Sequence, residues 1–123
     1  TRTSRHVVFT LVEMPQATPG KAGLVLLKRA DRMLRGTLGA RSQFAAPLGW
    51  ALTQENLAIV SLAMAEYHPP AERSRHLMVA SSHVSAALKV FRIECDTYYT
   101  SNATKLAGEI KRSGSSGPAK NAF

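Results

Sequence analysis

The sequence predicts an all-α protein, with three to four helices in a small bundle flanked by an extended N-terminal arm and a C-terminal tail. Apolar residues recur at helical spacing in successive stretches, and prolines and glycines fall between them. The chain has 123 residues, 45% of them hydrophobic and 7% aromatic, which suits one domain with a single modest core. We expect an arm at 1–20, a single helical domain at 21–112 and a Gly/Ser/Pro-rich tail at 113–123.

The first segment is predicted to be extended. Residues 6–14 are rich in β-branched types, which favour an arm or a short strand, and Pro15 and Pro19 then interrupt the chain. Residues 1–12 contain arginine, serine and threonine but no acid, a composition similar to the end of an organellar transit peptide. The absence of an initial Met fits either removal of that residue or cleavage of such a segment.

The next segment, 21–38, is predicted to form a strongly two-sided helix. At about 100° per residue, four cations fall within one narrow arc and five apolar residues fall within another. We call the cations, Lys21, Lys28, Arg32 and Arg35, the basic stripe. The apolar arc consists of Leu24, Leu27, Ala30, Leu34 and Leu38. A helix held to a core by its apolar edge would present the stripe either to solvent or to an anionic partner.

A loop is expected at 39–51, around Pro47 and Gly49, with Trp50 closing one end of the core. A second helix is expected at 53–67, with Thr53 as its N-cap. Its run from 57 to 65 is apolar nearly all round, which predicts burial either in the monomer or in an oligomer.

A long third helix is predicted from Pro70 to about Tyr99, since proline is tolerated in a first helical turn. Its evidence is a heptad-like series that we call the seam: Leu77, Val84, Leu88, Phe91, Cys95 and Tyr98. A break near 79–82, where β-branched residues and serines lower helix propensity, is the alternative. A last helix is expected at 102–112, with apolar residues on one face and Gly114 after its end.

The chain carries 16 Lys and Arg against 8 Asp and Glu, a formal net charge of +8. This balance favours RNA, DNA or an anionic lipid surface as partner. The single cysteine, Cys95, cannot form an internal disulfide, which indicates a reducing intracellular compartment. No apolar stretch is long enough for a transmembrane span.

Catalytic and metal-binding chemistry is not indicated by any residue pattern. His68, His76 and His83 include no close ligand pair, and the chain lacks a Gly-rich phosphate loop, a nucleophile elbow and a Cys-x-x-Cys motif. His83 lies too far from Cys95 on a helix to act as its base. We therefore expect no enzyme activity, no cofactor and no metal.

One segment resembles a bacterial helix-turn-helix. In 72–90, ERSRHLMVASSHVSAALKV, residues 73–77 would form a first helix, 78–80 the turn and 81–90 the recognition helix. Residues 24–91 resemble the MarR-type regulators, which are winged-helix dimers that bind DNA. The resemblance would place four side chains at base edges: Ser81, Ser82, His83 and Ser85. Met78 stands where the turn usually has glycine, and no wing follows Phe91.

These observations predict a non-catalytic basic accessory subunit of a large multi-subunit assembly. A ribonucleoprotein is the first expectation, in the mitochondrial matrix or alternatively in a bacterial cytoplasm. RNA would be bound through its phosphate backbone by the basic stripe, with both termini reaching neighbouring subunits. A soluble subunit of a respiratory-type complex, a DNA-binding regulator using 73–90, and a self-associating helical bundle remain alternatives.

Overall fold

The structure is a computed structural model that describes the backbone of residues 21–40, 43–94 and 96–121. It confirms the all-α prediction: four helices form a small bundle, and no strand occurs in these ranges. The helices are α2 (Lys21–Ala40), α3 (Pro47–Ala65), α4 (Pro70–Ile93) and α5 (Thr97–Asn121). The arm at 1–20, including the strand considered at 6–14, lies outside the described residues.

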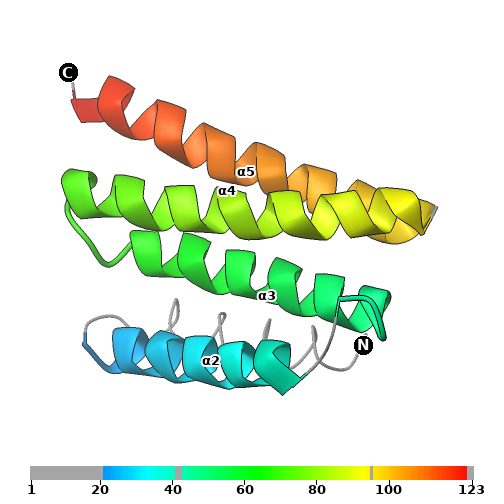
Figure 1. Cartoon of the computed structure of the whole chain (residues 1–123). Coiled ribbons are helices and arrows are strands. Elements are labelled where there is room, and N and C mark those ends of the chain that lie inside the picture. Colours follow the sequence, from blue (N-terminus) through cyan, green and yellow to red (C-terminus); the bar gives the residue numbers. More distant parts are fainter. Residues whose placement is uncertain (1–20, 41–42, 95, 122–123) are drawn as a thin grey trace.

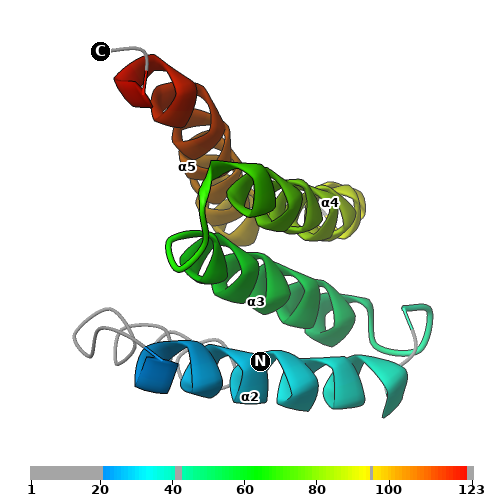
Figure 2. The same cartoon turned by 90° about the vertical axis from the view of Figure 1, so that its left-hand side faces the viewer.

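The helices lie side by side in the order in which they occur along the chain (Figure 1). α3 packs mainly against α4 and to a lesser extent against α2, whereas α5 packs on α4 and barely reaches α3. Figure 2, a view turned by 90°, places α2 at one edge and α5 at the opposite edge. The basic helix α2 is therefore an outer element, and its only packing partner among the described helices is α3.

The apolar helix α3 is the centre of the bundle. All its residues from Ala51 to Ser61 are buried, as expected for a helix that is apolar nearly all round. Its start differs from the predicted one, because Pro47 occupies the first turn and Ala46, not Thr53, is the N-cap residue. A proline in the first turn loses no helical hydrogen bond, so Pro47 begins the helix rather than sustaining a loop. Trp50 is half-buried against the core.

The predicted long third helix is divided into two. α4 ends at Ile93, and α5 begins at Thr97, so the helix spanning 70–99 was a wrong prediction. The cause is Asp96, whose carboxylate accepts a hydrogen bond of 2.9 Å from the backbone N–H of Tyr99, as an N-terminal cap does. The alternative break at 79–82 is absent, because α4 is continuous there.

The seam holds only within α4. Leu77, Val84, Leu88 and Phe91 are all buried, but Tyr98, beyond the turn, is 55% exposed. Tyr99 packs in its place, with its ring 5.4 Å from that of Phe91. Cys95 lies outside the described residues. The expected core residues of the last helix, Ala103, Leu106 and Ile110, are buried.

The helix α5 is longer at both ends than the predicted 102–112. Its backbone continues through 113–121, the first part of the segment expected to be a tail. Gly114 lies inside the helix and is close to the Leu77 side chain of α4.

Candidate functional site

The basic stripe lies on the outer side of α2, next to the residues that α2 buries. Leu27, Ala30 and Leu34 are buried, while Lys28 and Arg32 are exposed. Lys21 begins the helix, and the structure describes its backbone only. Arg29, which the sequence analysis did not single out, is also exposed on this helix. The packing of α2 therefore holds a group of cations towards the outside of the bundle.

Arg35 forms an ion pair within α2. Its Nε donates to Asp31 Oδ2 over 2.9 Å, one helical turn away, and the Arg35 side chain is 50% exposed. An exposed pair at this spacing stabilises the folded chain by only about 0.3–0.5 kcal/mol. Asp31 offsets part of the charge of Arg35. Lys28 and Arg32 therefore contribute more than Arg35 does to the positive electrostatic potential of the stripe.

A hydrogen bond joins a histidine of α4 to a glutamine of α3. His83 Nδ1 lies 2.6 Å from Gln54 Oε1, and both residues are largely shielded from solvent. The pKa of His83 is lowered from its usual value of 6.5, first by burial and then by the charge of Arg35, while Asp31 opposes the change. Charged groups of α2 thus act on a side chain of α4 across α3.

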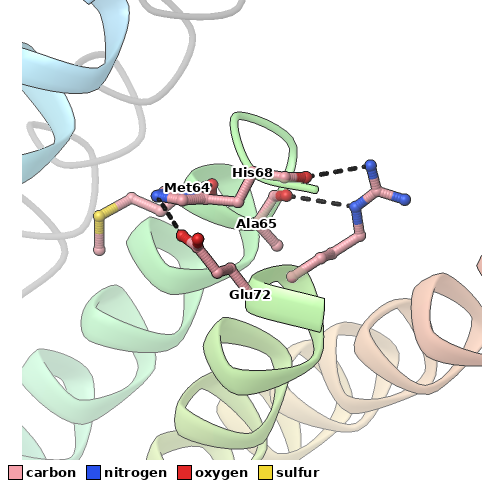
Figure 3. Close-up of polar contacts among 5 residues, drawn as sticks. Met64, Ala65, His68 and Glu72 are labelled. Carbon is pink, nitrogen blue, oxygen red and sulfur yellow. Dashed lines mark hydrogen bonds and ion pairs between the residues drawn. The ribbon is translucent and has the colours of Figure 1, made fainter. Parts of the chain in front are cut away.

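A second polar cluster surrounds the turn between α3 and α4 (Figure 3). His68 Nδ1 lies 2.9 Å from the carbonyl oxygen of Met64, and His68 Nε2 lies 3.8 Å from Glu72. The His68 and His76 rings are 4.4 Å apart. Burial lowers the pKa of His76, followed by the charges of His68 and Arg75, with Glu72 and Asp31 opposing.

Arg73 ties this turn to the end of α3. Its guanidinium donates to the carbonyl oxygens of Ala65, at 3.3 Å, and His68, at 3.2 Å (Figure 3). Carbonyl groups at a helix C-terminus have no partner within the helix and carry partial negative charge. Arg73 satisfies them and is half-buried, so we assign it a structural role.

The residues considered for base contacts in the helix-turn-helix interpretation lie on one uninterrupted helix. Ser81, Ser82 and Ser85 are exposed on α4, whereas His83 is turned towards Gln54. A helix-turn-helix needs a turn at 78–80, where α4 has none. These residues therefore do not form that motif.

Among the described residues, no three His, Cys, Asp or Glu side chains are placed to hold one metal ion. Within those residues, no helix has the length and apolar character needed to cross a membrane. Comparisons with protein-family models, with curated proteins and with solved structures find no match to this chain.

The stripe follows from the sequence, but two polar contacts were missed, one between α3 and α4 and one within α2. The pairing of Gln54 with His83 joins residues 29 positions apart, and no local pattern signals it. The Asp31–Arg35 pair has the four-residue spacing of helical ion pairs and could have been recognised from sequence.

Proposed function

We propose that this protein is a non-catalytic, basic accessory subunit of a larger assembly that contacts the phosphate backbone of RNA. The observation that carries the proposal is the outward placement of Lys28 and Arg32 on a helix whose opposite side is buried in the core. Cations held in this way neutralise phosphates without reading base edges, so binding depends on charge rather than on sequence.

The charge distribution elsewhere supports an anionic partner. The chain carries a net charge of +8. Further exposed cations occur on the other helices, including Arg75, Lys89 and Arg92 on α4 and Lys105, Lys111 and Arg112 on α5. Long-range attraction by such an excess speeds encounter with RNA, while the local density on α2 favours that helix as the contact.

The alternative of self-association receives less support. Its two proposed interfaces were the apolar run on α3 and the seam, and both are largely buried within a single chain. A partner copy would have to use other residues. A mitochondrial or bacterial location remains part of the proposal and does not affect the mode of binding.

The test compares RNA binding by the wild-type chain with binding by Lys28→Glu/Arg32→Glu. The matched control is Lys105→Glu/Lys111→Glu, which makes the same charge change at exposed positions of α5. Fluorescence anisotropy with a single-stranded RNA, repeated over a salt series, gives the affinity and the number of phosphates neutralised. We expect the α2 variant to bind at least about tenfold more weakly and to lose about 1.4 from the salt slope, at about 0.7 per phosphate.

The control variant should lose much less affinity. Equal losses in the two variants would mean that only net charge matters, and an RNA affinity unaffected by either would refute the proposal. Purification from the native cell with and without nuclease adds a second test, because partners held through RNA should be released by nuclease. Tight binding to anionic lipid vesicles with no RNA binding would indicate a membrane surface instead.

A further inference from the structure

The outward side of α2 carries apolar side chains as well as cations. Val25 and Met33 are 52% and 55% exposed, although the other side of the same helix is buried in the core. At about 100° per residue, Val25 lies on the side of the helix opposite the buried Leu27 and Leu34. The helix therefore exposes apolar groups on the side away from α3, its only packing partner among the described helices.

Three cations of α2 lie around Val25 on this side. Lys28 and Arg32 fall to one side of it around the helix, Arg29 falls to the other, and all three are exposed. Met33 lies at the edge of the same arc, which spans about 140°. Along the helix axis, Val25 and Met33 are about 12 Å apart, and the three cations lie between them. We call these five residues the outer face of α2, on which apolar and positive groups are interleaved.

Two glycines lie beside the outer face, nearer the end of α2. Gly36 and Gly39 are exposed, and a Cβ added to either would meet no described atom within 4 Å. Glycine inside a helix lowers the stability of that helix relative to alanine, and it is useful where a ligand must approach the backbone closely. Packing within the described chain accounts for neither glycine. The open backbone at Gly36 instead leaves room for an outside group to approach α2.

A duplex and a single strand of RNA would meet the outer face differently. A duplex offers phosphates and sugars on its outside and keeps its base faces stacked inside, so Val25 and Met33 would stay in water. An unpaired strand presents both phosphates and base faces. A thioether such as that of Met33 packs favourably on an aromatic ring. The guanidinium planes of Arg29 and Arg32 can stack on bases as well.

We propose that the outer face of α2 binds single-stranded in preference to duplex RNA, with its cations on phosphates and unpaired bases packed on Val25 and Met33. This inference rests on the proposed RNA-backbone function and specifies the form of RNA that is bound. The added contacts are to base faces, so they raise affinity without reading the order of the bases. An anionic lipid surface fits less well, because it takes up a broad apolar helix face, and that face of α2 is buried.

The first measurement compares the affinity for a single-stranded RNA with the affinity for a duplex of the same length. A surface that contacts phosphates alone should bind the duplex at least as tightly, because a duplex carries negative charge at higher density. We expect the wild-type chain to bind the single strand at least about threefold more tightly. Equal affinities, or tighter binding of the duplex, would overturn the inference.

The variant Val25→Ala/Met33→Ala removes the apolar contacts and leaves every charge in place. Alanine is favourable in helices and both positions are exposed, so the fold should be retained. This variant should bind the single strand about fivefold more weakly, with an unchanged salt slope and an unchanged affinity for the duplex. The matched control is Met78→Ala, at a 73% exposed methionine of α4, and it should bind as the wild type does. Wild-type affinity in the α2 variant would contradict the inference.

A second measurement needs no variant. The chain contains four methionines, and NMR can follow their methyl resonances. The ring current of a base packed on Met33 should shift its methyl signal when the single strand is added, while the signals of the exposed Met78 and the buried Met64 stay in place. A Met33 signal that does not move in the single-strand complex is evidence against the inference. Failure to bind either form of RNA instead refutes the proposed function itself, and the two failures are thereby distinguished.

Discussion

Phe91 of α4 and Tyr99 of α5 stack on each other across the turn that joins their helices, with ring centroids 5.4 Å apart. Phe91 is fully buried, and Tyr99 is half-buried against the same core. The pair closes α5 onto α4 directly after the cap formed by Asp96. Stacked aromatic pairs add about 0.5–1.5 kcal/mol to the stability that burial provides.

Tyr99→Ala should therefore destabilise the fold more than Tyr98→Ala does. The neighbouring Tyr98 is 55% exposed and touches Tyr99 edge-on, so its removal costs less buried area. We expect a loss of about 2–4 kcal/mol for Tyr99→Ala and about 1 kcal/mol or less for Tyr98→Ala. Urea denaturation followed by circular dichroism measures both values. A larger loss of stability for Tyr98→Ala than for Tyr99→Ala would instead support the predicted seam, which placed Tyr98 in the core.

Arg73→Gln should lower stability through the end of α3. The substitution removes the charged donor that reaches the carbonyl groups of Ala65 and His68. Hydrogen bonds from charged groups contribute about 1.5–3 kcal/mol when well formed, and half-burial here places the expected loss near 1–2 kcal/mol. Arg75→Gln, at an exposed position of the same helix, is the control and should cost about 0.5 kcal/mol or less. Similar losses for both would exclude this capping role.

Ser61→Ala is expected to stabilise the protein. Ser61 is 1% exposed on α3, and its hydroxyl has no hydrogen-bond partner among the described residues. Removing such a group eliminates a desolvation penalty of about 1–3 kcal/mol and leaves only a small cavity. A thermal midpoint several degrees above that of the wild type would show the gain. Thr53→Ala is the contrasting variant, because the Thr53 hydroxyl donates to the Gly49 carbonyl over 2.9 Å.

Stability should decrease as the pH falls below the ordinary histidine pKa of 6.5. The pKa values of His76 and His83 are lowered in the folded chain, chiefly by burial, so the unfolded chain binds more protons below 6.5. The stabilising difference is present above 6.5 and is lost as the pH falls through the folded values. Urea titrations at about pH 7.5 and about pH 5.5 should show a lower free energy of unfolding at the lower pH. The double variant His76→Gln/His83→Gln should show a smaller difference between the two pH values. If the double variant loses as much stability as the wild type when the pH falls, the pH dependence comes from the carboxylates and not from these histidines.

Most of the helical content was predictable, because apolar residues recur at helical spacing in α2 and α4 and run nearly all round α3. α2 was placed closely, since its buried Leu27, Ala30 and Leu34 recur at helical spacing. Boundaries were less predictable where one residue type has two roles. Pro47 was interpreted as a loop residue but begins α3, and Asp96 was absorbed into an apolar series although it caps α5.

The candidate site was predictable only in its local part. The basic stripe follows from periodicity on one helix, and Lys28 and Arg32 are exposed as the pattern indicated. The hydrogen bond between His83 and Gln54 depends on how α3 and α4 pack, and the spacing of residues along the chain does not encode it. Helical periodicity shows which face a residue occupies but not which neighbour that face meets.

The arrangement of each described helix beside its neighbour in the chain has a consequence for folding kinetics. α3 meets α4, and α4 meets α5, so most tertiary contacts join segments that a single short connection separates. The chain therefore closes small loops to reach its topology, and the entropy lost before contacts form is low. Helical proteins with such low contact order fold within about microseconds to milliseconds. This one should collapse and order its helices rapidly as it leaves the ribosome.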